Sequence, residues 1–316
     1  MSNFRSYLKM GCLAGLKRGW RSFLWICRII IPVSLLVTLL QWTGWLNQLS
    51  FLLSPLMNLI NLPFQAALPI IGGMLINAYV TIAAMTALPF TIGQMKLITV
   101  FTLICHNLII EGIIQHKSGI NIIKITLIRI TAAILTVLIA SQFLGDTSQS
   151  IPVAAQLTVD APLLVVLKDW AVNLITLLIK ILGIIIVIMI MLELSQFLGW
   201  TEYSVKIFRP LMKVFGLPER AANLWVISVG FGLTYGGAVT IDEAKRGILN
   251  KEELERLHIS IGINHSMVED PPLFLALAIN PFWVWLPKLL MAIIAVQLYR
   301  AIRYLKNKLL HGEAEF

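Results

Sequence analysis

Charged residues are scarce in this chain, where Asp, Glu, Lys and Arg make up only 13% of the 316 residues. An ordinary soluble domain contains about 25% charged residues, whereas 58% of this sequence is hydrophobic and its mean hydropathy is +0.84. A helix is one of the few structures that satisfy all of their own backbone hydrogen bonds in lipid. The sequence therefore predicts an all-α integral membrane protein whose first partner is the lipid bilayer.

Motifs for zinc binding, nucleotide hydrolysis and covalent catalysis are also missing. Cys12, Cys27 and Cys105 are isolated, without the paired spacing of a zinc site or the density of a disulfide framework. No G-x-x-x-x-G-K-[ST] run or nucleophile motif is present, so we expect neither an enzyme nor a bound cofactor. The net charge of +9 does not indicate nucleic-acid binding, because the basic residues cluster beside apolar runs and thereby set membrane orientation.

Six segments are apolar and long enough to cross the ~30 Å hydrocarbon core of a bilayer. They are residues 22–41, 97–115, 120–143, 170–198, 258–279 and 282–299. Residues 1–21 mix basic and apolar side chains, which is typical of an amphipathic helix lying on the cytoplasmic surface. We expect the rest of the chain to divide into a first repeat at 22–145, an external linker at 146–169, a second repeat at 170–305 and a cytoplasmic tail at 306–316.

Two apolar stretches are rich in glycine: residues 226–238, V-I-S-V-G-F-G-L-T-Y-G-G-A, and residues 68–81, L-P-I-I-G-G-M-L-I-N-A-Y-V-T. Each glycine costs about 1 kcal/mol relative to alanine in a helix interior. Transporters hold their solutes at interrupted helices of this kind, so we predict two broken, re-entrant segments. The alternative is a pair of intact helices whose small residues admit a close neighbour.

The two halves of the sequence repeat each other. Residues 54–63 match 209–218 at an offset of 155, and beyond the glycine stretches the offset becomes 159, which aligns His106 with His265 and Glu111 with Asp270. Residues 42–96 contain one basic residue and the equivalent residues 200–258 contain eight. Because basic loops face the cytoplasm, we predict two inverted repeats, each with about three spanning helices plus one broken segment.

Ionisable side chains within the apolar segments are the first candidates for a functional site, because a charge inside a membrane is costly. Asn107 and Glu111 are four residues apart and are expected to share one face of a continuous helix. His106, His265, Glu269 and Asp270 form the candidate set for ion coupling or metal binding. They suit a coupling proton or sodium ion, or a divalent metal as the substrate; interfacial helix ends satisfied by water are the alternative for the carboxylates.

Uncharged polar groups in the glycine-rich stretches suit a neutral ligand. The candidate substrate-binding residues are therefore Asn77, Thr81, Asn107, Glu111, Thr234, Tyr235, Gly236 and Gly237. Glu193 is a further candidate for lining the path. Arg28, Lys180 and Lys288 lie near span ends, where we expect their charged groups to reach the membrane interface.

Both glycine-rich segments are followed by a histidine and a carboxylate, as H-x-x-x-x-E and as H-x-x-x-E-D. With the opening G-L-K-R-G-W at residues 15–20, these motifs resemble the nucleoside-recognition (Gate) family of membrane proteins, over residues 15–305. The resemblance implies a multi-pass permease in the cytoplasmic (inner) membrane of a bacterium. It also implies a relationship to the permease part of the ferrous-iron transporter and to spore-maturation membrane proteins. The asymmetry of basic residues places both termini on the cytoplasmic side.

Three functions remain open from the sequence. The first is a permease for a small polar, nucleoside-like solute that binds between the broken segments near the membrane midplane. The second is a divalent metal-ion permease, and the third is a membrane assembly or regulatory protein that transports nothing. A homo-oligomeric state is also left open.

Overall fold

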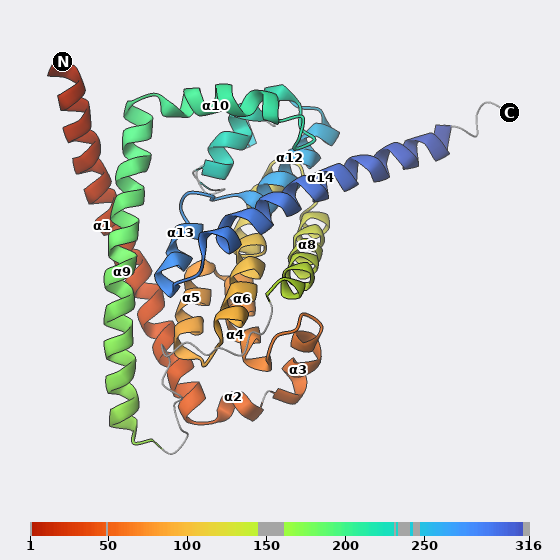
Figure 1. Cartoon of the computed structure of the whole chain (residues 1–316). Helices are drawn as coiled ribbons and strands as arrows, with labels where there is room; N and C mark the ends of the chain where they lie inside the picture. The colour runs from red at the N-terminus through yellow and green to blue at the C-terminus, as the bar shows by residue number, and fades with distance from the viewer. Residues whose placement is uncertain are drawn as a thin grey trace.

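The structure is a computed structural model that describes residues 2–48, 50–144, 161–230, 232, 241–242 and 247–311. Every regular element within these residues is a helix (Figure 1). The all-α fold expected from composition is therefore confirmed. It places the chain among integral membrane proteins, because five of its helical segments are long and apolar enough to span a bilayer.

The five candidate spans are α1 (Ser2–Trp42), the pair α6 (Ile92–Ile104) and α7 (Leu108–Lys117), α8 (Ile122–Gln142), α9 (Leu163–Phe197) and α14 (Pro281–His311). The α6–α7 pair is central, since 72% of its apolar window is buried, whereas the other four windows are 28–33% buried. The central position of this pair also places its interruption inside the protein rather than against lipid.

Several helix boundaries differ from the expected segments. Helix α1 continues without a break from Ser2 through residue 21 into the first span, and α9 begins at Leu163, ahead of the expected start at residue 170. The expected fifth span, 258–279, is instead formed by α12 (Lys251–Asn264), α13 (Pro271–Phe274) and η3 (Leu275–Leu277). Two prolines and a loop divide that segment, because proline lacks the N–H that a continuing helix needs.

The first glycine-rich segment is interrupted, although not at its glycines. Helix α4 (Ala67–Leu75) contains Gly72 and Gly73, and α5 (Ala78–Ala87) begins after Ile76 and Asn77. A Cβ at Gly73 would collide with the hydroxyl of Thr81 on α5, so the glycine pair admits a close neighbour, as the packing alternative anticipated. In the second half, residues 222–230 are helical, and Gly236 and Gly237 lie outside the described residues.

Equivalent local structures recur in both halves at the two offsets that the sequence contains. The short helices η1 (Phe64–Ala66) and η2 (Glu219–Ala221) are 155 residues apart. Thr91 and Asn250, 159 residues apart, each close a capping box at the start of α6 and α12. These two pairs, one of short 3-10 helices and one of helix caps, support an internal duplication of the chain.

The start of α12 carries one further ion pair outside the spans. Burial alone would raise the pKa of the Glu253 carboxyl, but the guanidinium of Arg220, 2.5 Å away, and the backbone N–H of Asn250 hold that pKa below its ordinary value. The capping box at this end of α12 is therefore supported by a charge.

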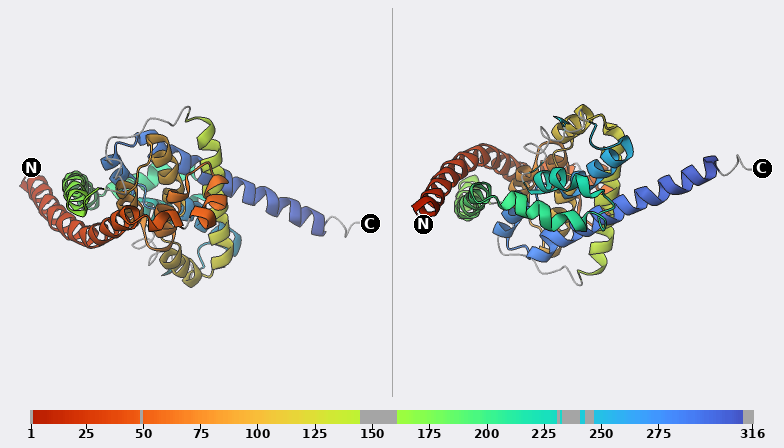
Figure 2. Two further views of the ribbon diagram at one scale, coloured as in Figure 1. Left: turned by 90° about the horizontal axis from the view of Figure 1, so that it is seen from below. Right: turned by 90° about the horizontal axis from the view of Figure 1, so that it is seen from above.

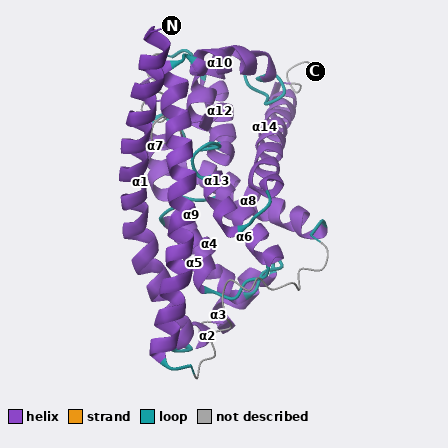
Figure 3. Cartoon of the chain, turned by 60° about the vertical axis from the view of Figure 1, so that its left-hand side comes forward, coloured by secondary structure: helices purple, strands orange, loops and turns teal. Residues whose placement is uncertain are grey.

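The helices are arranged with the two halves facing each other. Figure 1 shows α2 (Trp45–Gln48) and α3 (Ser50–Asn58) at one end of the molecule and α10 (Trp200–Leu211) at the opposite end. Figure 2 shows the distal part of α14 extending away from the body of the protein. Helices α1 and α9 run side by side along its edge (Figure 3).

Small residues set the spacing between α1 and α9. Gly15 and Gly19 on α1 face Ile190 and Ile186 on α9, and a Cβ added at Gly15 would lie 2.5 Å from the Ile190 Cα atom. Glycines four residues apart are a common means of bringing two membrane helices into close contact.

We predict that Gly15→Ala lowers the stability of the protein by about 1–3 kcal/mol, because the added methyl group forces the two backbones apart. Gly183→Ala on α9 is the matched control, since no atom lies within 4 Å of its added Cβ; it should gain up to about 1 kcal/mol from helix propensity. Thermal unfolding in detergent measures both changes. Equal melting temperatures for the two variants would contradict the packing argument.

We also predict that the two ends of the molecule lie on opposite sides of the membrane, as inverted repeats require. Cys12, Cys27 and Cys105 would first be replaced, and single cysteines then introduced at the exposed positions Asn47 and Lys251. A membrane-impermeant thiol reagent applied to intact cells should label Asn47→Cys and leave Lys251→Cys unlabelled until the cells are opened. Labelling of both positions from outside would rule out the inverted arrangement.

Candidate functional site

Two interrupted helical segments supply the central residues of the site. The first interruption separates α6 from α7 at residues 105–107, and the second separates α12 from α13 at residues 265–270. Asn107 and Ser266 both adopt a left-handed backbone, with φ of 53° and 55°. The span expected over residues 97–115 is not continuous, because the left-handed turn at Asn107 separates α6 from α7; Asn107 is the N-cap residue of α7, and its carbonyl accepts from the Glu111 N–H at 3.1 Å.

The glycine-rich segments hold both interruptions in place. The N–H of Asn107 donates to the Gly73 carbonyl at 3.0 Å, and the N–H of Met267 donates to the Val229 carbonyl at 2.7 Å. The backbone of each interruption therefore finds partners outside its own helix, as it must at membrane depth. The sequence predicted the glycine-rich segments and the histidine motifs separately; the fold joins them by hydrogen bonds.

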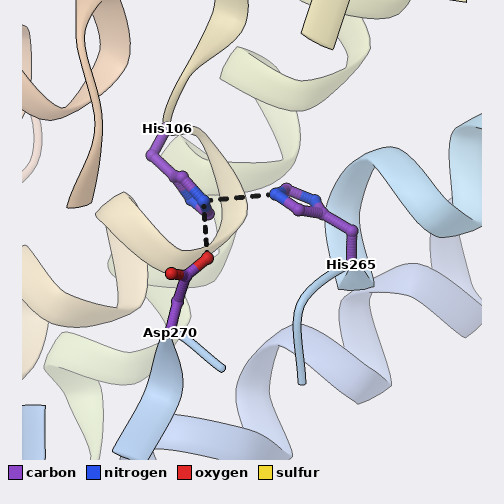
Figure 4. A group of neighbouring side chains, drawn as sticks. All are labelled: His106, His265 and Asp270. Atoms are coloured by element: carbon purple, nitrogen blue, oxygen red, sulfur yellow. Dashed lines mark hydrogen bonds and ion pairs between the residues drawn. The ribbon is translucent and has the colours of Figure 1, made fainter. Parts of the chain in front are cut away.

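The two histidines meet between the halves (Figure 4). His106 Nε2 and His265 Nε2 are 3.2 Å apart, and their ring centres are 4.7 Å apart. Both side chains are buried. The two histidines that the offset of 159 aligns in the sequence are therefore in direct contact in the structure.

Each histidine also contacts the carboxylate of the other half. His106 Nε2 lies 3.2 Å from an Asp270 oxygen, and His265 Nε2 lies 2.8 Å from a Glu111 oxygen. This crossed arrangement gathers four of the predicted residues, His106, His265, Glu111 and Asp270, at one centre. Within the described residues, His106, His265 and Asp270 form a group whose ligand atoms all lie within 4.8 Å of one another.

Two basic residues that the sequence analysis did not assign to the site complete it. The Arg129 guanidinium pairs with Glu111 at 2.6 Å and donates to the carbonyls of Ile104 and His106 at 3.1 and 2.8 Å. The Lys288 ammonium donates to the His265 carbonyl at 2.9 Å. Arg129 and Lys288 are 159 residues apart, so the offset that aligns the histidines would have revealed this pair.

The expected position of Lys288 at the membrane interface is incorrect, because its side chain is fully enclosed and only 1% of its surface is exposed. Its charge is used inside the protein, where it satisfies a carbonyl that the helix interruption leaves without an intrahelical partner. Glu193 pairs with Arg18 on α1 at 2.9 Å, away from the histidines.

The remaining predicted residues lie in other environments. The Asn77 side chain caps α5 by accepting from the N–H groups of Tyr79 and Val80, and the Thr81 hydroxyl donates to the Pro69 carbonyl. Glu269 lines a small cavity with Tyr79 and residues of α1 and α9. Thr234, Tyr235, Gly236 and Gly237 lie outside the described residues.

The fold and the site define a multi-pass, all-α membrane protein in which two broken helical segments bring ionisable groups together inside the protein. The nucleoside-recognition family called Gate matches residues 23–143. The uncharacterized membrane protein YvoD of Bacillus subtilis (strain 168) is 30% identical over 274 residues, which cover 86% of this chain and 88% of that protein. The chain therefore belongs to the Gate family of membrane proteins. No solved structure matches it.

We predict that Arg129→Gln destabilises the protein by about 3–5 kcal/mol, because it leaves the Glu111 carboxylate buried without its cationic partner. The double variant Arg129→Gln, Glu111→Gln should recover part of this loss, since it removes the orphaned charge as well. Arg18→Gln, at the partly exposed pair with Glu193, is the control and should cost no more than about 1 kcal/mol. Unfolding of the purified proteins in detergent measures the three values. A loss at Arg129 no larger than at Arg18 would contradict the assignment.

Proposed function

We propose that this protein is a membrane permease that carries a small cation through the centre formed by His106, His265, Glu111 and Asp270. The observation that supports this function is the convergence of two histidines and two carboxylates from both halves at the helix interruptions. Ionisable groups are rare inside membrane proteins and are typical of ion pathways and coupling sites.

The architecture supports transport over a purely structural role. In many secondary transporters, broken helices from two repeats surround the binding site, and movement of one repeat against the other exposes the site to each side in turn. Here four side chains, two from each half, meet at the centre, so a movement of one half against the other would change the contacts among them.

The proposal also includes the location and orientation of the protein in the membrane. We place the protein in the cytoplasmic membrane of a bacterium, with both termini in the cytoplasm, because the basic residues concentrate at the end of the molecule that carries α10 and the start of α12. A transported cation would then pass between a basic cytoplasmic end and a nearly uncharged outer end.

A second candidate function is uptake of a nucleoside-like solute, which the family description favours. In this case the histidine–carboxylate centre would bind the coupling proton or sodium ion. The described part of the first glycine-rich segment gives this candidate less support than the cation, since Asn77 and Thr81 already hydrogen bond within the protein.

We predict that proteoliposomes containing the purified full-length chain take up cations, measured with an entrapped metal-sensitive dye, and that His106→Ala and Asp270→Asn reduce the initial rate at least about tenfold. His116→Ala is the control, because His116 is exposed near the end of α7 and should leave the rate unchanged.

Labelled uridine is tested in the same vesicles with and without imposed proton and sodium gradients. Gradient-dependent uridine uptake without cation uptake would replace the first candidate by the second. Vesicles that take up neither class of solute would overturn the proposed function and favour a membrane assembly role.

A further inference from the structure

The second ring nitrogen of each central histidine has a fixed role. His106 Nδ1 lies 2.9 Å from the Thr102 carbonyl, and His265 Nδ1 lies 3.1 Å from the Ile261 carbonyl. A carbonyl oxygen only accepts hydrogen bonds, so Nδ1 carries the hydrogen in both rings. Nε2 of each neutral ring is then a bare lone pair.

These lone pairs point at other acceptors. Nε2 of His106 faces Nε2 of His265 at 3.2 Å and an Asp270 oxygen at 3.2 Å. Nε2 of His265 faces a Glu111 oxygen at 2.8 Å. Four electron-rich atoms therefore meet with no hydrogen of their own between them, and such an arrangement needs a proton or a metal ion among them.

The spacing of these atoms suits a transition metal. Ligands about 2.0–2.1 Å from a tetrahedral metal ion are ~3.3 Å from each other, close to the two separations of 3.2 Å at His106. Calcium and magnesium favour oxygen ligands, whereas imidazole favours zinc, iron, nickel and copper. The hydrogen bond from each Nδ1 to a backbone carbonyl is also the usual outer contact of a metal-binding histidine.

Arg129 distinguishes the two carboxylates. One Glu111 oxygen is held by the Arg129 guanidinium at 2.6 Å, whereas Lys288, at the equivalent position, donates to a backbone carbonyl instead. Glu111 is therefore already neutralised by a cation of the protein. Asp270 is the carboxylate whose charge is directed at the histidines.

From these contacts we infer that the centre binds a divalent first-row transition-metal ion through His106 Nε2, His265 Nε2 and the Asp270 carboxylate, with Glu111 bordering the site. The inference rests on the proposed function and specifies the cation. Arg129 and Lys288 offset two of the three nearby carboxylates, Glu111, Glu269 and Asp270, so the ion's charge is not fully neutralised. Binding is consequently weaker than in a structural zinc site, as release during transport requires.

The test uses the purified full-length chain in detergent, freed of metals and titrated separately with Mn²⁺, Co²⁺, Zn²⁺, Mg²⁺ and Ca²⁺ in a calorimeter. We expect saturable binding of the transition-metal ions and none of Mg²⁺ or Ca²⁺. His106→Ala, His265→Ala and Asp270→Asn should each weaken binding at least about tenfold, and the exposed His116→Ala should match the unmodified protein. Bound Co²⁺ should also show the intense visible absorption of a tetrahedral site.

A second measurement uses the unmodified chain, so its result does not depend on whether the variants fold. Diethyl pyrocarbonate modifies unprotonated imidazole nitrogens, and mass spectrometry reports the modification at each histidine. Co²⁺ should slow the reaction at His106 and His265 and leave it unchanged at His116. Absence of transition-metal binding, equal binding of Ca²⁺, or binding that survives all three substitutions would overturn the inference.

The outcome is separable from that of the transport assay. Metal binding at these residues without flux in proteoliposomes would sustain the metal site and refute the permease. Flux of another solute with no metal bound would sustain the permease and refute the metal site.

Discussion

Backbone that leaves the helix inside a membrane must find hydrogen-bond partners within the protein, and this constraint governs the centre of the molecule. The interruption after α6 leaves the carbonyls of Ile104 and His106 without helical partners, and the Arg129 guanidinium donates a hydrogen bond to each. The interruption after α12 frees the carbonyl of His265, which Lys288 binds. Two cations are thereby fixed inside an apolar fold.

The buried cations in turn lower the free-energy cost of burying carboxylates nearby. Glu111 lies against Arg129, whereas Asp270 faces Nε2 of His106 at 3.2 Å and takes its positive charge from the ion inferred at the centre. A charge without such a partner would cost several kcal/mol in this environment. The helix interruptions, the basic residues that satisfy them and the acidic residue that pairs with Arg129 therefore form one connected set of contacts.

The crossed histidine–carboxylate contacts also hold the two halves together at the centre. Each histidine takes its carboxylate from the opposite half, so the centre exists only while the halves are together. Relative motion of the halves would take these ligands apart and change the affinity for whatever lies between them. A binding site that is assembled and disassembled by domain movement is what alternating access requires. The tight glycine contact of α1 with α9 also joins the two halves and lies at the edge of the molecule.

Composition and hydropathy determined that the chain is all-α and embedded in a membrane, since helix length and apolar content are local properties of the sequence. The repeat offset of 159 aligned His106 with His265 and Glu111 with Asp270, and that alignment already contained most of the candidate site. Only the tertiary structure decided that the histidine segments are interrupted, because hydropathy over a window does not register a left-handed turn at Asn107 or Ser266. It likewise decided that Gly72 and Gly73 pack inside a helix, that Arg129 is buried in the site, and that Lys288 is buried there too and does not reach the membrane interface. These outcomes depend on contacts between side chains and carbonyls of different helices, and no local pattern encodes which helices come together.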